Sequence, residues 1–158
     1  MLTAGCAGYR MGSTNGAEAG TRTIRVAYFE NQTLEPRLSE AIANAMRKQF
    51  QLDGTYRLVT GSEEADVLVT GKLTRLVRAP VTFDPRDTYT TRDEEMVLFA
   101  NVLAVDRLTN AKLLDREVIG RLTVRILPNE TAAEHQAIPQ LAGDFASKAV
   151  PMIVDGSW

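Results

Sequence analysis

The chain has 158 residues, of which 44% are hydrophobic and 24% charged. That composition is typical of one mixed globular domain and excludes disordered, collagen-like and coiled-coil chains. Its net charge of −2 lacks the basic excess of a nucleic-acid binder. No run of about 18 apolar residues predicts a membrane-spanning helix. One Cys and one His exclude an internal disulfide and a zinc site of clustered Cys and His. We therefore expect no metal and no cofactor.

The N-terminus has the pattern of a bacterial lipoprotein signal, because small residues precede the lone Cys6. The signal peptidase needs small side chains beside the scissile bond, and acylation of the cysteine then anchors the protein in a membrane. We expect residues 1–5 to be the remnant of that signal and Cys6 to be lipidated. Residues 6–22 carry a glycine at every fourth position from 8 to 20 and are predicted to form a flexible tether. The alternative, a buried structural cysteine, fits this glycine-rich stretch less well.

The folded domain is predicted to begin at Thr23 and to extend to residue 158. Residues 23–29 are rich in β-formers and alternate, which predicts a strand, and residues 30–33 are predicted to form a turn. A helix is expected from Pro36 to about Leu52, ended by Gly54 in the left-handed conformation. Its apolar side chains fall at helical spacing: Leu38, Ile42, Ala45, Met46 and Phe50.

Four more strands and a helix complete the predicted domain. The strands are expected at residues 56–59, 66–78, 95–106 and 113–127, and residues 79–92 are predicted to be a long loop or a frayed hairpin end because they contain two prolines. The C-terminal helix is predicted from apolar side chains at helical spacing: Ile138, Leu141, Ala142, Phe145, Ala149 and Ile153. The order β-α-β-β-β-β-α predicts an α+β fold, a two-layer sandwich with two helices on one face of a mixed, mostly antiparallel sheet.

Several segments, in matching order, resemble the LptE family of lipopolysaccharide-assembly lipoproteins. They are Cys6-Ala-Gly-Tyr-Arg, Val26-Ala-Tyr-Phe-Glu-Asn-Gln-Thr, Glu35-Pro-Arg-Leu-Ser-Glu-Ala, Asp53-Gly-Thr-Tyr-Arg-Leu-Val, Ala65-Asp-Val-Leu-Val-Thr-Gly and Asp155-Gly-Ser-Trp. The resemblance implies a lipid-anchored protein on the periplasmic side of the outer membrane. It also implies two partners, lipopolysaccharide and the β-barrel translocon that the family plugs. Ala7, in place of the Asp that retains lipoproteins at the inner membrane, agrees with sorting to the outer membrane.

A second function from another class remains open at this point. Regulatory or scaffold lipoproteins of the curli-secretion or peptidoglycan-synthase-activator type also begin their domain with a strand similar to Val26-Ala-Tyr-Phe-Glu-Asn. Co-purification with a large barrel and with lipopolysaccharide would separate the two hypotheses.

An enzymatic function is not expected. A catalytic triad needs a histidine, a nucleophile and a carboxylate that converge. His135 and Ser147 are predicted on one helix, where twelve residues span about 18 Å at roughly 1.5 Å per residue. These two side chains therefore cannot meet.

Two sets of side chains are candidate binding residues. If strand alternation holds, Lys72, Arg121 and Arg125 project from the sheet face away from the helices, where they could bind the phosphates of lipopolysaccharide. Exposed charges of this kind also often do no more than solvate a sheet face.

The strand at residues 95–106 supplies the second set. One face of it is expected to contact the helices through Met96, Leu98, Ala100, Val102 and Ala104. The opposite face is also mostly apolar, with Val97, Phe99, Asn101, Leu103 and Val105. Because antiparallel sheets normally present polar residues to water, we predict that Val97, Phe99, Leu103 and Val105 form a partner interface, unless residues 79–92 or the tether cover them.

Overall fold

The structure is a computed structural model and describes residues 19–61, 64–84, 86–125 and 130–156, without the side chains of residues 84, 87–92 and 130–135. Its elements are β1 (Arg22–Val26), β2 (Glu30–Asn31), α1 (Leu38–Asp53), β3 (Tyr56–Leu58), β4 (Val67–Asp84), β5 (Asp87–Asp106), β6 (Lys112–Arg125) and α2 (Glu130–Asp155).

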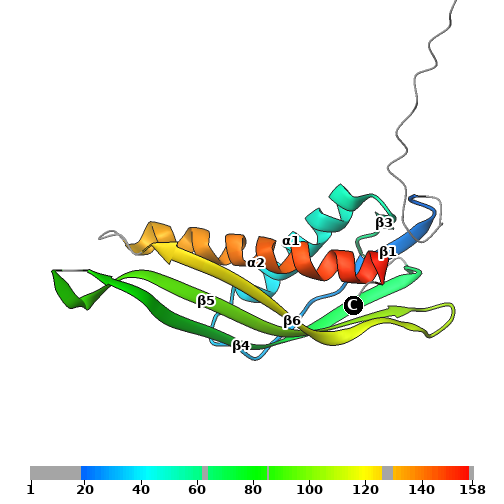
Figure 1. The fold of residues 1–158 in the computed structure, drawn as a ribbon. Helices are drawn as coiled ribbons and strands as arrows, with labels where there is room; N and C mark the ends of the chain where they lie inside the picture. Colours follow the sequence, from blue (N-terminus) through cyan, green and yellow to red (C-terminus); the bar gives the residue numbers. More distant parts are fainter. Residues whose placement is uncertain (1–18, 62–63, 85, 126–129, 157–158) are drawn as a thin grey trace, which may run out of the picture.

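The strands form one mixed sheet in the order β3-β1-β4-β5-β6, with β2 beside β4. The long pairs β4–β5 and β5–β6 are antiparallel, whereas β1 pairs in parallel with β3 and β4, and β2 in parallel with β4. Both helices lie on one face of this sheet, and the other face is left uncovered by helices (Figure 1). The predicted α+β sandwich is therefore confirmed, with β2 as an added strand.

The core lies between the helices and the sheet. Its largest fully buried side chains come from both layers: Phe29, Phe50, Phe145, Ile24, Leu38, Ile42, Met46, Leu73, Leu98, Leu114, Leu141 and Val67. The apolar positions predicted for the two helices are in this set or pack beside it. Periodicity at 3.6 residues predicted these faces correctly because burial of an apolar stripe is what stabilises short helices.

One core contact depends on a glycine. The ring of Phe29 lies directly over Gly71 of β4, where a Cβ would be 2.1 Å from the ring. A side chain at this position would therefore collide with a fully buried aromatic residue. Gly71 lets the segment after β1 pack down on the sheet.

The first helix ends as predicted. Gly54 has φ 76° and donates its N–H to the carbonyl of Phe50, the left-handed arrangement that glycine adopts without strain. The helix starts at Leu38, so that Pro36 lies just before it. The second helix continues through Pro139 and Pro151.

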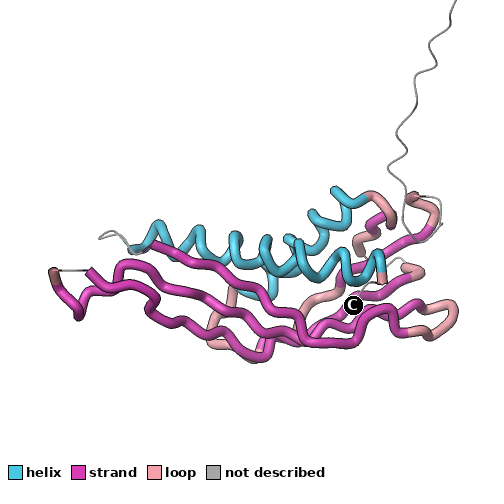
Figure 2. The backbone as a smooth tube through the Cα atoms, viewed as in Figure 1, coloured by secondary structure: helices cyan, strands magenta, loops and turns pink. Residues whose placement is uncertain are grey.

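Of the two alternatives predicted for residues 79–92, the hairpin end is observed and the long loop is not. β4 runs on to Asp84 and β5 starts at Asp87, and the two strands form a long hairpin (Figure 2). Pro80 is compatible with this hairpin because proline is tolerated on an edge strand when its nitrogen faces away from the ladder. One local prediction was wrong. Within the predicted turn at residues 30–33, Glu30 and Asn31 pair with Lys72 and Leu73 as β2. A two-residue strand has no periodicity that a sequence pattern could reveal.

Candidate functional site

The sheet face that points away from α1 and α2 is called the outer face here. Alternation along β5 places Met96, Leu98, Ala100, Val102 and Ala104 under the helices, and all five are buried as predicted. The intervening residues of β5 lie on the outer face: Val97, Phe99, Asn101, Leu103 and Val105. No helix of the described chain covers this face (Figure 1).

The apolar side chains of the outer face shield one another. Val97 is 9% exposed, while Phe99, Leu103 and Val105 are half-buried. Neighbouring strands add three half-buried apolar residues at facing positions: Leu68 opposite Val105, Val77 opposite Val97, and Ile119 opposite Phe99. The set of seven is called the apolar stripe below. Residues 79–92 do not fold over it, because they continue the hairpin outward; the tether up to residue 18 lies outside the described residues.

A β-bulge in β4 brings a further cation to the outer face. Leu73 faces Ala100 and Arg75 faces Phe99, so that Thr74 is the extra residue. Simple alternation would have put Arg75 on the helix side with Leu73. Instead the Arg75 guanidinium carbon lies 4.2 Å from the centre of the Phe99 ring, within the range of a cation–π contact. The sequence signal for this bulge is the pair Leu73 and Leu76, whose odd spacing breaks the period of two.

The three predicted ligand cations share the outer face but form no cluster. Lys72, Arg121 and Arg125 stand opposite Asn101, Val97 and Asp93 along β5. At about 3.3 Å per residue, successive cations are offset by about 13 Å along the strand direction, and Lys72 is also separated from the other two by the width of β5. Each already has a carboxylate partner, because Lys72 pairs with Glu30 at 3.2 Å, Arg121 with Glu95 at 3.6 Å and Arg125 with Asp93 at 3.3 Å.

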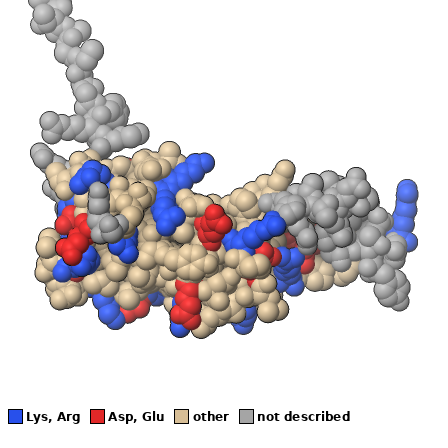
Figure 3. Space-filling model, turned by 180° about the vertical axis from the view of Figure 1, so that it is seen from behind, with Lys and Arg blue, Asp and Glu red and all other residues tan. Residues whose placement is uncertain are grey.

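Charges are interspersed elsewhere on the molecule too. In the view from behind, basic and acidic side chains alternate over the surface (Figure 3). Exposed pairs of this kind exchange partners at little cost, since a surface salt bridge contributes about 0–1 kcal/mol. A phosphate could therefore replace a carboxylate beside an outer-face cation.

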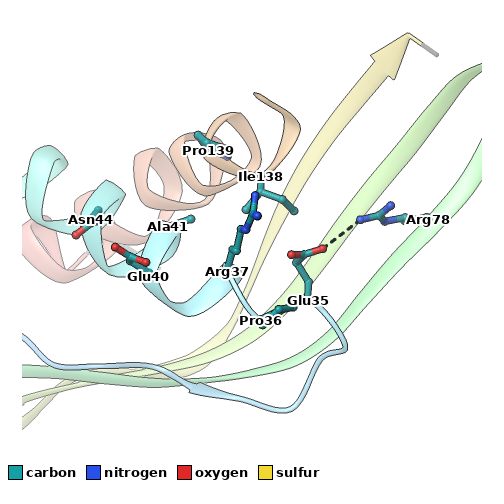
Figure 4. Close-up of a pocket in the computed structure, with 9 residues that line it drawn as sticks. All are labelled: Glu35, Pro36, Arg37, Glu40, Ala41, Asn44, Arg78, Ile138 and Pro139. Atoms are coloured by element: carbon teal, nitrogen blue, oxygen red, sulfur yellow. Dashed lines mark ion pairs between the residues drawn. The ribbon is translucent and has the colours of Figure 1, made fainter. Parts of the chain in front are cut away.

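A pocket of about 660 Å³ lies on the helix side, between the start of α1, α2 and β4 (Figure 4). Glu35 and Arg78 form an ion pair across it at 3.5 Å, and Arg37 and Glu40 add one charge of each sign. Because these charges compensate, the pocket does not select an ion of either sign. Arg78 is three residues after Arg75 in regular register and so lies on the opposite face of the sheet, which separates the pocket from the stripe.

The end of the sheet beside the tether is fixed by a polar network. Asp66 accepts the backbone N–H of Thr23 at 2.7 Å and its hydroxyl at 2.9 Å, and these bonds lower the pKa of Asp66. Burial raises the pKa of Asp106, but its bonds from Arg22 and from the N–H groups of Leu108 and Thr109 outweigh that effect and leave the pKa lowered. The network joins β1 to the end of β5 and has the character of a structural clamp.

The described residues contain no group of three or more His, Cys, Asp or Glu side chains that could hold a metal ion. No described helix is long and apolar enough to cross a membrane. Cys6 and the side chain of His135 lie outside the described residues. The hydroxyl of Ser147 donates to the carbonyl of Asp144 within α2.

Solved structures of other proteins share this fold. The structure is similar to a hypothetical protein from Chlamydia trachomatis (6% identity, TM-score 0.58, 86% of this chain and 99% of that one). It is also similar to the PelC dodecamer from Paraburkholderia phytofirmans (13% identity, TM-score 0.56, 86% of this chain and 90% of that one). A putative lipoprotein from Caulobacter crescentus shares the fold as well (13% identity, TM-score 0.53, 80% of this chain and 87% of that one). At these identities the likeness supports the fold alone.

Sequence comparison is more specific. No curated protein matches the chain, but the family model described as "LptE: Lipopolysaccharide-assembly" matches residues 21–150. The match extends from β1 into α2 and so includes every strand of the sheet. The chain therefore belongs to the LptE family of lipopolysaccharide-assembly proteins.

Proposed function

We propose that this chain is an outer-membrane lipoprotein that binds lipopolysaccharide and plugs the β-barrel translocon that inserts it into the outer leaflet. Membership of the LptE family supports the assembly role. The observation that carries the finer proposal is the outer face, where an apolar stripe rimmed by cations has no helix over it in the described chain. The role is that of a binding and assembly component without a catalytic step.

The chemistry of the outer face suits lipopolysaccharide. Its lipid part carries phosphates next to acyl chains, so a binder needs Arg or Lys beside apolar side chains. Arg75 over Phe99 provides both within 4.2 Å, and Lys72, Arg121 and Arg125 extend the cationic rim. We propose these four residues as contacts for the ligand.

The apolar stripe also suits docking inside a barrel. Val97, Phe99, Leu103 and Val105 are proposed to contact the barrel wall. Complete burial of a side chain such as Phe99 or Leu103 contributes about 1.5–3 kcal/mol, less the part that neighbours already shield. Four or more such residues would hold the protein stably in place.

Cys6 is proposed as the lipid anchor on the periplasmic side of the membrane. Fifteen residues, Ala7 to Thr21, separate it from the start of β1, and a glycine-rich linker of this length reaches roughly 20 Å. The mass of the N-terminal peptide of protein isolated from membranes tests this point. An unmodified Cys6 would contradict it.

Charge substitutions test docking. The variants Phe99→Glu and Leu103→Lys are expected to lose co-purification with the barrel while the isolated protein stays folded by circular dichroism. Leu108→Lys is the matched control, because Leu108 is 77% exposed in the turn after β5 and lies off the stripe. Unfolding of the two variants would instead assign the stripe to the protein's own core, and retained barrel binding would exclude it as the interface.

A further inference from the structure

The two sides of the sheet differ in whether their outward backbone groups are bonded. On β6, Asp144 of α2 accepts the outward N–H of Arg121 at 2.8 Å, and Lys148 donates to the outward carbonyl of Ile119 at 3.4 Å. Lys148 and Asp144 are themselves paired at 2.6 Å. The helix thus caps this edge with side chains and blocks the addition of another strand.

On the opposite side the sheet ends at β3, but β1 and β2 cover only the first part of β4. β1 pairs with residues 67–69 and β2 with Lys72 and Leu73, and Gln32 donates its N–H to the carbonyl of Leu73 at 2.9 Å. The carbonyl of Leu73 therefore faces away from β5.

Beyond the bulge this edge is open. Residues of an antiparallel strand alternate in the direction of their backbone groups, and with Thr74 as the extra residue, Leu76 is the next one whose N–H and C=O face away from β5. No backbone group of the described chain bonds to Leu76 from that side. Pro80 ends the open stretch because proline has no N–H to offer.

A groove of about 490 Å³ runs along this stretch. One wall is β4 from Thr74 to Arg78, and the other is the Gln32–Glu35 loop that leads to α1. Leu34 in that loop is fully exposed, so the groove offers an apolar side chain beside free backbone groups.

Arg75 adds a charge preference. Lys72, Arg121 and Arg125 on the same face are each paired with a carboxylate. Among the residues that the structure describes, Arg75 contacts the Phe99 ring but pairs with no carboxylate. An acidic group in an occupant of the groove would therefore meet an uncompensated cation.

We infer that the β4 edge at residues 75–79 is a docking site for an extended segment of a partner protein. The segment adds one short strand in line with β2, places an apolar side chain against Leu34 and an acidic one toward Arg75. A polypeptide is the occupant because a donor and an acceptor at strand spacing, matched to Leu76, are what an extended backbone supplies. The inference shares Arg75 with the lipopolysaccharide contacts proposed above, but the open backbone edge at Leu76 does not depend on them.

A peptide titration tests this inference. The probe is the capped peptide Thr-Val-Glu-Val-Glu-Val-Thr, added to the ¹⁵N-labelled full chain and followed by NMR. We expect amide shifts centred on Leu76 and none at Arg121, whose N–H is already bonded. Leu76→Pro removes the outward N–H and is expected to weaken binding about fivefold relative to Leu76→Ala, which keeps it.

A separate pair of changes, one in the peptide and one at Arg75, tests the charge preference without altering the backbone groups of β4. A peptide with Lys in place of Glu is expected to bind about threefold more weakly, and Arg75→Glu should reverse that order. Equal binding by Leu76→Pro and Leu76→Ala, or no shift at Leu76 in the unmodified chain, would overturn the inference.

Two further outcomes would name a different occupant and would also overturn it. If the Leu76 shift depends on protein concentration without peptide, a second copy of the chain occupies the edge. If the Leu76 amide is protected in the full chain and becomes exposed after removal of residues 1–18, the occupant is the chain's own N-terminal segment.

Discussion

Arg22 and Asp106 are 84 positions apart in the chain, yet Nη2 of Arg22 lies 2.6 Å from Oδ2 of Asp106. Arg22 is the first residue of β1, directly after the predicted tether, and Asp106 is the last of β5. Together with the bond of Asp66 to Thr23, this pair holds the short parallel strands to the long hairpin. The chain beside the predicted anchor is thereby fixed to the sheet that carries the outer face.

The clamp predicts a loss of stability in acid. The pKa values of Asp66 and Asp106 are lowered in the folded protein, so their stabilisation is present above the unfolded value of about 3.9 and is lost as the pH falls through the folded values. We expect the Tm to fall between about pH 5 and pH 3. The double variant Asp66→Asn/Asp106→Asn should be less stable at pH 7 and lose less Tm over this range. Melting curves that shift in parallel would contradict this.

A side chain at Gly71 is expected to destabilise the protein by a steric clash. Gly71→Ala is expected to destabilise the fold by about 1–3 kcal/mol, because the new Cβ meets the Phe29 ring at 2.1 Å. Gly143→Ala in α2 has nothing within 4 Å of its Cβ and should be neutral or stabilise by about 0.5–1 kcal/mol. Urea denaturation of both variants measures the difference, and equal stabilities would show that the Phe29 contact is not maintained.

Loss of the buried hydrogen bond of Ser39 is expected to lower stability. Its side chain is fully buried in the first turn of α1, and its hydroxyl donates to the carbonyl of Phe29 at 2.8 Å. Ser39→Ala should cost about 1–2 kcal/mol because a buried acceptor loses its donor. Ser147→Ala removes an exposed hydroxyl that bonds within its own helix and should change the free energy of unfolding by less than about 0.5 kcal/mol. A similar small effect for both would argue against the bond.

The outer-face cations predict ligand binding. Replacement of Lys72, Arg121 and Arg125 by Asp should weaken lipopolysaccharide binding in vitro by about tenfold or more, since each is a proposed phosphate contact, and change the Tm little because their ion pairs are exposed. The control with the same charge change replaces Lys48, Arg107 and Arg116, which are exposed and lie off this face. An equal loss of lipopolysaccharide binding in both triple variants would show that binding depends on the net charge and not on these three positions.

Sequence patterns predicted the helices, the long strands and the buried face of β5, because apolar periodicity directly reflects burial in these elements. They did not reveal β2, which is too short to show a period. They also missed the bulge at Thr74, since one inserted residue reverses the phase of the rest of the strand. For that reason Arg75 was absent from the predicted site although it contacts the predicted Phe99.

The prolines explain why the sequence left two alternatives open for residues 79–92. Two prolines indicated a loop or a hairpin end. The cost of a proline in a strand depends on which way its nitrogen faces, and that direction is set by the register of β4 on β5. The spacing of the three predicted cations could not be foreseen either, because sequence gives the face of a residue and not its position along the neighbouring strand.

The central claim is that this LptE-family protein works as a lipopolysaccharide-binding plug of an outer-membrane barrel. It is tested most directly by affinity purification of the tagged full chain from detergent-solubilised outer membranes, with mass spectrometry of the co-purified proteins and lipids. The account predicts one large β-barrel protein in a one-to-one ratio, together with lipopolysaccharide, and the loss of both in the Phe99→Glu variant. A chain recovered without a barrel and without lipopolysaccharide would contradict it.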